Sequence, residues 1–276
     1  MVDSDGADTD LAQWLERIEA LHPREIELGL DRVAEVYRRL GITKPATVIT
    51  VAGTNGKGSC VAAMERLLCQ LDKSCGAFSS PHLLRFNERI RIDGQPVADR
   101  ALCAAFAHID HVRGEIPLTY FEFGTLAALW LFAEQGVEYG LLEVGLGGRL
   151  DAVNIIDADV AVVTSIDLDH QQWLGEDLES IATEKLGIAR AGAPLIVGES
   201  RRLQAFETCS ERLGVTIRRL GHDFSLEDQR YYECADYQLD LAPSNFVVSS
   251  LACAIAALRQ TAVRGSLQDA VAGLAD

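Results

Sequence analysis

Positive charge is scarce in this sequence of 276 residues. Lysine and arginine together number 25, against 41 aspartates and glutamates, which leaves a formal net charge of −16 at pH 7. Such an excess of negative charge repels phosphate backbones and anionic lipid headgroups, so nucleic acid and membrane surfaces are not expected as partners. An anionic ligand would need a local positive site on this chain.

Long apolar runs are also missing, although 48% of the residues are hydrophobic. A helix that spans a bilayer needs about 20 consecutive apolar residues, and no stretch of this sequence supplies them. The first residues, Met1 to Gly6, are acidic and polar, which does not fit a secretory signal peptide. These absences predict a cytoplasmic protein that buries its apolar residues in a sizeable core.

No two cysteines are spaced as C-x-x-C, a spacing typical of zinc and redox sites. The seven cysteines lie at positions 60, 69, 75, 103, 209, 234 and 253, and several fall in apolar stretches. Their odd number and placement favour reduced thiols over a disulfide framework. His108 and His111 could share a helix face near Cys103, but no further ligands follow at zinc spacing, so no zinc site is predicted.

The most informative segment that is present runs from Val48 to Ser59 and reads VITVAGTNGKGS. It predicts a buried strand, a glycine-rich turn and the start of a helix. Glycines allow a tight turn whose N–H groups face an anion, while the helix N-terminus and a lysine add positive charge. Only two residues separate Gly53 from Gly56-Lys57, so the spacing differs from the standard phosphate-binding loop. The alternative is an ordinary turn that happens to carry a lysine.

Strand and helix patterns alternate along most of the chain. Strands are expected at 47–52, 75–79, 141–144, 159–164 and 194–198, helices near 11–21, 30–40, 59–71, 99–112, 122–135, 177–190 and 246–258, and a hairpin at 89–94. Unalternating, β-branched strands between helices are typical of a parallel sheet covered on both faces. The predicted fold class is therefore α/β, a mostly parallel sheet of the P-loop type with helices on both faces. Residues 1–10 are expected to form a flexible tail, and the polar region 220–242 permits no assignment.

Polar residues follow three of the predicted strands. Ser80 comes after one strand, Glu143 ends another, and Asp167, Asp169 and His170 follow a third. The carboxyl ends of parallel strands meet at one edge of a sheet, where ligands gather. A hydroxyl, a carboxylate and an imidazole that converge there could hold Mg²⁺ beside a polyphosphate, although an imidazole is an unusual ligand for this ion. The alternative for His170 is a loop or capping residue.

Several motifs stand in the same order as in a known enzyme family. They are Gly53-Thr54-Asn55-Gly56-Lys57-Gly58-Ser59, Ser79-Ser80-Pro81-His82-Leu83, Thr119-Tyr120-Phe121-Glu122-Phe123, the run from Leu142 to Ala152, Asp169-His170, and Glu184-Lys185-Leu186-Gly187-Ile188. From about Trp14 to Leu258 the chain resembles the folylpolyglutamate synthase and dihydrofolate synthase family, a branch of the Mur ligases. Within that family it is most similar to the bacterial bifunctional members.

The resemblance implies an ATP-dependent amide ligase of folate metabolism. ATP would phosphorylate the carboxylate of dihydropteroate, and the amine of L-glutamate would attack the acyl phosphate to give dihydrofolate, ADP and phosphate. In a second activity the acceptor would be a reduced folate that already carries glutamate. ATP and Mg²⁺ are the implied cofactors, and catalysis would consist mostly of positioning and charge neutralisation. The sequence leaves open whether one activity or both are present.

The resemblance also implies roles for individual residues. The phosphates of ATP would be held by Thr54, Asn55, Gly56, Lys57, Gly58 and Ser59, and Asn245 would be a further contact to ATP. Mg²⁺ would be bound by Ser80, Glu143, His170 and Lys185, the last carbamylated by CO₂; the alternative for Lys185 is a solvated helix lysine. The folate substrate would contact Glu25, Ile26, Glu27, Leu28, Thr119, Tyr120, Phe121, Glu122, Leu150, Asp151 and Ala152. Lys57, His170 and Lys185 would be the catalytic residues.

Members of this family are substantially longer and carry a second, Rossmann-like α/β domain at the C-terminus. Residues 11–276 would then form the ATP-binding domain, with the start of the interdomain region near 260–276. The chain is expected to fold as a monomer and to ligate poorly or not at all by itself. Two alternatives stay open. A small-molecule kinase or a different Mur-type ligase would respond to another substrate, and a non-catalytic nucleotide- or folate-binding module would bind ATP without turnover.

Overall fold

An eight-stranded sheet forms the centre of the computed structural model, which describes residues 10–22, 27–233, 237–241 and 245–275. The strand order is β4-β3-β2-β5-β1-β6-β7-β8. The strands are β1 (Thr47–Ala52), β2 (Cys75–Phe78), β3 (Ile90–Ile92), β4 (Gln95–Pro96), β5 (Tyr139–Glu143), β6 (Val160–Val163), β7 (Leu195–Val197) and β8 (Ile217–Arg219). The six strands from β2 to β8 in this order are parallel, whereas β3 pairs antiparallel with both β2 and β4. The predicted α/β class with a mostly parallel sheet is confirmed.

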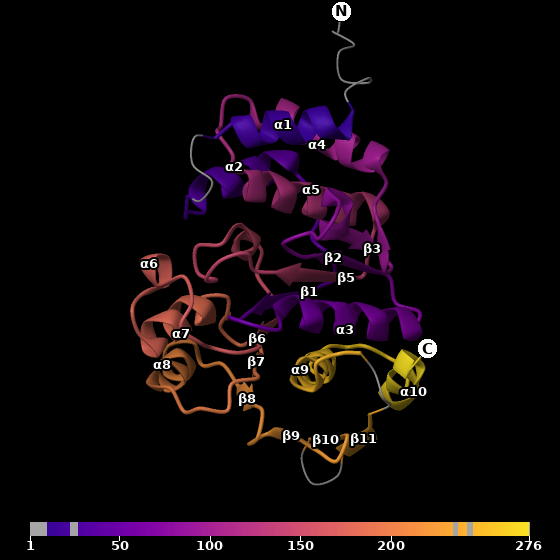
Figure 1. Cartoon of the computed structure of the whole chain (residues 1–276), viewed down its shortest axis with the longest axis vertical. Coiled ribbons are helices and arrows are strands. Elements are labelled where there is room, and N and C mark those ends of the chain that lie inside the picture. Colours follow the sequence, from indigo (N-terminus) through magenta and orange to yellow (C-terminus); the bar gives the residue numbers. More distant parts are fainter. Residues whose placement is uncertain (1–9, 23–26, 234–236, 242–244, 276) are drawn as a thin grey trace, which may run out of the picture.

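Helices cover both faces of the sheet (Figure 1). One face carries α1 (Leu11–Ala20), α2 (Asp31–Leu40), α4 (Asp99–Arg113), α5 (Tyr120–Gln135), α7 (Leu178–Leu186) and α8 (Gln204–Leu213), and the other carries α3 (Lys57–Gln70), α9 (Val248–Leu258) and α10 (Leu267–Ala272). Each face has its own buried apolar cluster. Successive residues of a strand point to opposite faces, so Leu142 of β5 packs in the cluster with α5, and Leu141 packs with α3. Shorter turns complete the chain: α6 (Gln171–Leu174), η1 (Phe86–Arg89), η2 (Ala152–Ile155) and η3 (Gly273–Ala275).

Local sequence signals set several of these boundaries. Thr119 and Glu122 form a capping box at the start of α5, in which the Thr119 N–H donates to Glu122 Oε2 at 2.7 Å and the Glu122 N–H to Thr119 Oγ1 at 3.3 Å. Helix α2 ends at Gly41, whose φ of 62° only glycine adopts readily. The predicted hairpin is present, with Asp93 and Gly94 at φ values of 49° and 78° in the turn between β3 and β4.

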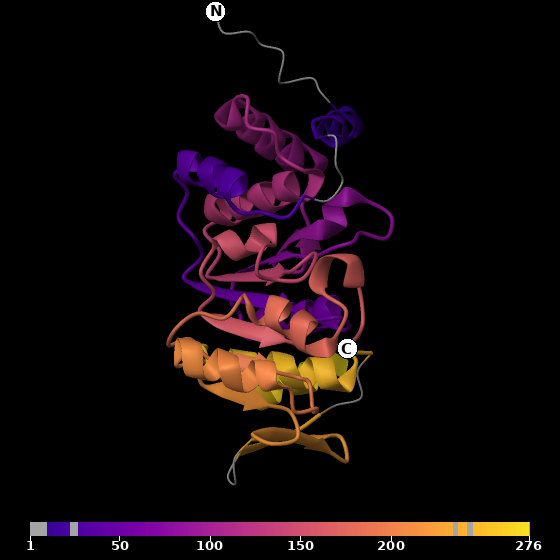
Figure 2. The same ribbon diagram turned by 90° about the vertical axis from the view of Figure 1, so that its left-hand side faces the viewer.

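A second, antiparallel sheet occupies the region that permitted no assignment. It consists of β9 (Phe224–Glu227), β10 (Arg230–Glu233) and β11 (Tyr237–Asp240). The turn between β9 and β10 places Asp228 and Gln229 at φ values of 46° and 60°, a conformation for which glycine is the usual signal. Because this turn contains no glycine, its hairpin was not recognisable from composition. Figures 1 and 2 show the small sheet at the end of the molecule opposite α1.

Other differences from the sequence predictions are smaller. The helix expected over 177–190 is α7, which ends at Leu186, and the helix expected from Phe246 begins at Val248. Helix α8 and strand β8 were not predicted. No helix within the described ranges is long and apolar enough to cross a bilayer.

The described cysteines are all free thiols, namely Cys60, Cys69, Cys75, Cys103, Cys209 and Cys253. Cys234 and residues 1–9 of the expected tail lie outside the described residues.

Strands β1, β2, β5 and β6 are adjacent and parallel, so the loops that follow them leave the sheet at the same edge. The predicted phosphate loop and three of the predicted metal ligands, Ser80, Glu143 and His170, lie in these loops or at the strand ends, whereas Lys185 lies on α7.

Candidate active site

The glycine-rich loop after β1 has a shape that only glycine permits at two positions. Gly53 has a φ of 151°, and a Cβ placed there would lie 2.0 Å from Thr164 Oγ1. Gly56 is the N-cap of α3 with a φ of 84°, and its Cβ would lie 2.8 Å from Ser250 Oγ of α9. The loop is therefore packed tightly between the chain after β6 and the start of α9.

Hydrogen bonds from the segment after β6 hold this loop in place. The Thr54 N–H donates to Ser165 O at 2.9 Å, and the Asn55 N–H donates to Ser165 Oγ at 2.9 Å. Thr164 Oγ1 donates to Asn55 O at 2.7 Å, and the Asp167 N–H donates to Thr54 Oγ1 at 3.0 Å. The N–H groups of Thr54 and Asn55 are thus used within the protein, while the first N–H groups of α3 have no partner inside their helix. Lys57, Gly58 and Ser59 supply these N–H groups.

Lys57 lies over the loop that precedes it. Its Nζ donates to Gly53 O at 2.9 Å and to Thr54 O at 3.3 Å. These acceptors are neutral carbonyls, and the ammonium also lines the cavity described below. The cation is therefore held close to the helix N-terminus, where an anion would gain from both positive charges.

Ser80 and Glu143 meet beside this helix. The Ser80 N–H donates to Glu143 Oε2 at 3.2 Å, and a Cβ added to Gly58 would lie 3.4 Å from the same oxygen. Burial raises the pKa of the Glu143 carboxyl, whereas the Ser80 N–H and the positive charges of Lys57 and Arg91 act in the opposite direction. One oxygen of this buried carboxylate, Oε1, has no protein hydrogen bond among the described contacts, which fits a group that binds a cation.

His170 and Lys185 lie in the part of the chain that follows β6, and His170 lines the same cavity as Lys57 and Ser80. His170 is the N-cap of α6, with a φ of 48°, and its half-exposed imidazole lies 3.6 Å from Asp169 Oδ2. Lys185 of α7 is only 3% exposed. Burial and the neighbouring charge of Lys57 lower the pKa of Lys185 to about 8, although Asp169 acts in the opposite direction. Lys185 is therefore a buried amine and not the solvated helix lysine that the alternative interpretation required.

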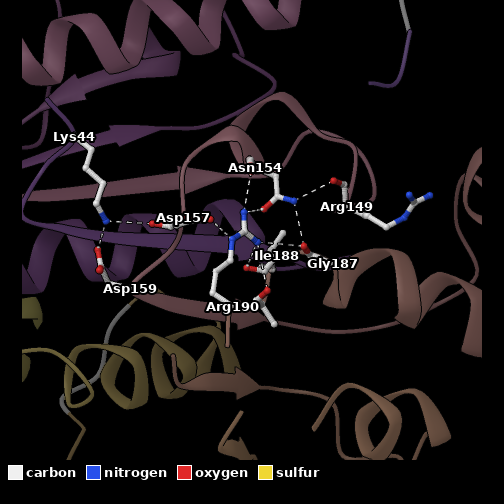
Figure 3. A network of polar contacts seen from close by, with 9 residues as sticks. Lys44, Arg149, Asn154, Asp157, Asp159, Gly187, Ile188 and Arg190 are labelled. Atoms are coloured by element: carbon white, nitrogen blue, oxygen red, sulfur yellow. Dashed lines mark hydrogen bonds and ion pairs between the residues drawn. The ribbon is translucent and has the colours of Figure 1, made fainter. Parts of the chain in front are cut away.

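A polar junction fixes the end of α7 against the loop that follows β5 (Figure 3). The Asn154 Nδ2 donates to Arg149 O at 3.0 Å and to Gly187 O at 3.1 Å. Arg190 NH2 donates to Asn154 Oδ1 at 2.9 Å, and its NH1 donates to Ile188 O at 3.2 Å. Both the Nδ2 group and the Oδ1 atom of Asn154 are therefore used to hold this junction together. The helix that carries Lys185 is thereby tied to one wall of the cavity.

A cavity of about 510 Å³ opens between the phosphate loop and α5. Its lining residues are Glu27, Leu28, Gly29, Lys57, Ser80, Pro81, Arg89, Thr119, Tyr120, Phe121, Glu122, Gly145, Leu146, Leu150, Asp151, Ala152 and His170. The structure thus brings nine predicted substrate residues to one cavity together with Lys57, Ser80 and His170. The other two predicted substrate residues, Glu25 and Ile26, lie outside the described residues.

Some predicted residues lie away from the cavity lining. Ser59 is half-buried in the first turn of α3, and Asn245 is exposed, two residues before the N-cap Val247 of α9. The contact between α9 and the phosphate loop is made instead by Ser250, whose Oγ donates to Gly56 O at 3.3 Å.

Two carboxylates in the cavity wall accept hydrogen bonds from the protein itself, at Oδ2 of Asp151 and at Oε2 of Glu122. Asp151 Oδ2 accepts the N–H groups of Gly145 and Leu146 at 3.0 and 2.9 Å, and burial raises the pKa of Asp151 to about 7 despite these bonds. Glu122 Oε2 accepts the Thr119 N–H and, at 3.0 Å, the Nε of Arg32. Both residues therefore shape the wall through their hydrogen bonds to the backbone and to α2.

Arg89 lines the cavity, although it was not among the site residues predicted from the sequence. Its guanidinium carbon lies 5.5 Å from the ring centroid of Phe86 and 5.4 Å from that of Tyr120, and its Nε donates to His82 Nδ1 at 2.8 Å. Burial lowers the pKa of Arg89. The alternation of Arg89-Ile90-Arg91-Ile92 before Asp93-Gly94 indicated only a hairpin. Thr164 and Ser165 were also missed, since small polar residues after a strand are an ordinary loop signal.

Comparisons with known proteins identify the family. No protein-family model matches the chain. The dihydrofolate synthase/folylpolyglutamate synthase of Escherichia coli K12 is 46% identical over 270 residues, which are 94% of this chain and 63% of that protein. The protein of the same name from Haemophilus influenzae is also 46% identical, over 80% of this chain and 51% of its own length. The chain thus spans between half and two thirds of these curated relatives.

Solved structures give the same result. The Escherichia coli enzyme FolC in complex with DHPP and ADP superposes with a TM-score of 0.92 at 45% identity, covering 97% of this chain and 67% of that one. The bifunctional folylpolyglutamate synthase/dihydrofolate synthase of Yersinia pestis, complexed with AMPPNP and a Mn ion, has a TM-score of 0.92 at 42% identity, covering 99% and 68%. The chain therefore has the fold of these enzymes and belongs to the dihydrofolate synthase/folylpolyglutamate synthase family.

Proposed function

We propose that this chain provides the ATP-binding and pterin-binding part of an ATP-dependent amide ligase, with residues 11–276 as its ATP-binding domain. The enzyme would join L-glutamate to dihydropteroate and to reduced folates through an acyl phosphate. One observation carries the proposal. The phosphate loop lysine, Ser80 and His170 line the same cavity of about 510 Å³ as Tyr120, Phe121 and Leu150. A flat aromatic substrate held there would extend its carboxylate toward the phosphates of ATP.

The positive end of the cavity suits the phosphates of ATP. Lys57 and the first N–H groups of α3 would neutralise the charge that develops on the γ-phosphoryl group during transfer. Within the described part of the chain Lys57 donates to the Gly53 and Thr54 carbonyls, so it needs to exchange two neutral acceptors for an anionic one. Charge-assisted hydrogen bonds are the stronger kind, which favours that exchange.

The residues beside the loop suit a divalent cation. Ser80, Glu143 and His170 offer a hydroxyl, a buried carboxylate and an imidazole, and oxygen-rich sets of this kind suit Mg²⁺ or Mn²⁺. The Yersinia relative binds AMPPNP together with Mn, which supports the assignment. When bound, the metal would neutralise phosphate charge and orient the phosphates. Ser80, Glu143 and His170 would hold it, and Glu143 would remain ionised because the bound charge opposes the effect of burial.

Lys185 has the properties required for carbamylation. With a pKa of about 8, its amine is partly neutral near pH 7.5, and a neutral amine is the form that attacks CO₂. The new C–N bond gives a carbamate and releases one proton. The product would replace a buried cation by an anion, which would remove the unfavourable electrostatic interaction with Lys57 and would offer an oxygen ligand to a second metal ion.

The apolar part of the cavity would hold the pterin and benzoate rings. Tyr120, Phe121 and Leu150 provide flat apolar surface, and the Escherichia coli relative binds DHPP. Arg89 is fixed against Phe86 and Tyr120 and would attract an anionic group of the substrates, which an otherwise strongly negative chain repels. The carboxylate oxygen would then accept the phosphoryl group as ADP leaves. Attack by the glutamate nitrogen on the carbonyl carbon would expel phosphate.

The test is ADP release from MgATP by the purified chain, with dihydropteroate and L-glutamate added separately and together. Release that requires both substrates, and that Lys57→Ala abolishes, would support the ligase. The chain by itself is expected to ligate poorly or not at all, so the non-catalytic binding module is tested in a protein of the relatives' full length. Binding of ATP by that protein without release under any condition would indicate such a module. Release stimulated by an unrelated hydroxyl or carboxylate acceptor would indicate a kinase or another Mur-type ligase. Mass measurement of the product with each acceptor separates one synthase activity from two, and sedimentation tests the expected monomer.

A further inference from the structure

Arg91 and Glu65 form a buried ion pair outside the machinery proposed above. The side chain of Arg91, on β3, is 18% exposed, and that of Glu65, on α3, is 6% exposed. The Arg91 Nε donates to Glu65 Oε2 at 2.8 Å and to Oε1 at 3.2 Å. Buried charges are tolerated only when they are paired and hydrogen-bonded. This pair therefore fixes β3 to the helix whose N-terminus forms the phosphate loop.

The same guanidinium holds a second segment of the chain at both of its ends. Arg91 NH1 donates to Ser79 Oγ at 2.9 Å and to Glu88 O at 2.8 Å. Within the segment, the Glu88 carboxylate accepts the backbone N–H groups of residues 83–85 at distances of 2.7 to 3.0 Å. The segment 79–88 is therefore a rigid loop whose base is set by Arg91.

That loop carries one of the residues assigned to the metal. Ser80 directly follows Ser79, and its N–H donates to Glu143 Oε2 at 3.2 Å. Glu143 in turn packs against α3, since a Cβ on Gly58 would lie 3.4 Å from Oε2. Ser80, Glu143 and the first turn of α3 thus converge. The Arg91–Glu65 pair connects the loop that carries Ser80 to α3 through separate contacts.

We propose that the Arg91–Glu65 pair is a positioning device that sets Ser80 against Glu143 at the spacing one divalent cation requires. The inference rests on the proposed function, because it assumes that Ser80 and Glu143 bind the metal. The fork of an arginine serves three acceptor groups on two segments at once, whereas a lysine is a single point charge without that planar geometry. Partners that orient metal ligands in this way typically change metal affinity about 10- to 100-fold when removed.

The experiment compares Mn²⁺ binding by the full chain and its variants, measured by electron paramagnetic resonance with the non-hydrolysable analogue AMPPNP present. We expect Arg91→Lys to weaken Mn²⁺ binding at least about 10-fold, and Ser79→Ala, which removes only the hydroxyl contact, to weaken it less than Arg91→Lys does but by more than about twofold. Binding of the nucleotide without metal should change less than about twofold in both variants, since neither touches the phosphate loop itself. Thermal unfolding monitors the folded state.

A matched control separates positioning from general stability. Arg218 NH1, on β8 of the large sheet, donates at 3.0 Å to Oε1 of the buried Glu233, on β10 of the small sheet. Arg218→Lys should lower the unfolding temperature and leave Mn²⁺ affinity unchanged. An Arg91→Lys variant that is folded and binds Mn²⁺ within twofold of the original chain would overturn the inference, and Ser79→Ala decides in the same way if Arg91→Lys does not fold. If the original chain binds no Mn²⁺ with AMPPNP, the proposed function fails, and the inference that depends on it fails too.

Discussion

Replacing Gly53 by alanine should damage the phosphate loop far more than one added methyl group suggests. The new Cβ would lie 2.0 Å from Thr164 Oγ1 and 3.2 Å from Ser165 N, at a φ of 151°. The Thr164 hydroxyl would have to leave Asn55 O, to which it now donates at 2.7 Å. The backbone of Ser165 cannot rotate away as a side chain can, so the loop itself must move.

The expected loss can be assembled from these contacts. Leaving a buried hydrogen-bonding group without its partner costs about 1–3 kcal/mol. Overpacking a tight site costs about 1–3 kcal/mol, and an unfavourable backbone conformation costs about 1–3 kcal/mol. The terms overlap, so we expect Gly53→Ala to lower the free energy of unfolding by about 3–5 kcal/mol, which is a large part of a typical stability of about 5–15 kcal/mol.

Urea denaturation with Gly214→Ala as a control tests this reasoning. Gly214 has a φ of 61° and no atom within 4 Å of the added Cβ, so that variant reports the backbone cost alone, about 1 kcal/mol. Adding Thr164→Ala to Gly53→Ala removes the closest contact and should recover at least about 1 kcal/mol in a double-mutant cycle. Equal losses for the two glycine variants, or strictly additive effects in the cycle, would refute the steric argument.

Three further predictions concern the cavity. In a protein of the relatives' full length, Lys57→Ala should abolish ATP turnover, measured as ADP release, because it removes the cation beside the phosphates; unchanged turnover would remove Lys57 from the mechanism. Lys185→Ala should lower turnover, and added short carboxylates should restore part of it by replacing the carbamate oxygens; full activity without them would show that no carbamate is needed. The pKa of Asp151 is raised from 3.8 to about 7, so the folded state binds more protons than the unfolded state between these values. The contribution of Asp151 to stability should be fully present below about pH 4 and lost as the pH rises through 7, and Asp151→Asn should flatten that part of the stability profile measured by denaturation.

Sequence patterns were sufficient where the physical signal is local. The helix expected over 30–40, which ends before Gly41, and the unalternating strands each depend on neighbours within a few residues. Because the parallel strands then determine which loops share an edge, the approach of Ser80 to Glu143 was predictable as well. The glycines around Lys57 are also a local signal, and their spacing indicated the phosphate loop.

The missed features depend on contacts between distant segments. Ser165 holds Asn55 across 110 positions of the chain, and nothing in a serine after a strand shows which loop it will contact. Arg89 belongs to the turn η1, where the two-residue alternation that places side chains on a strand does not apply. The carboxylates of Asp151 and Glu122 line the cavity as expected, but only the folded structure shows that backbone N–H groups donate to them.

The attachment of Thr54 and Asn55 to the chain after β6 has a thermodynamic consequence for nucleotide binding. Fixing the backbone of one residue costs about 1–2 kcal/mol in conformational entropy, and here the loop is already fixed when the protein folds. Nucleotide binding then has only the Lys57 side chain to rearrange at this loop. Calorimetry of AMPPNP binding should therefore show no heat-capacity signature of coupled folding, and the association rate should not be limited by loop ordering. Loosening the loop at Ser165 would transfer that entropy cost from folding to binding.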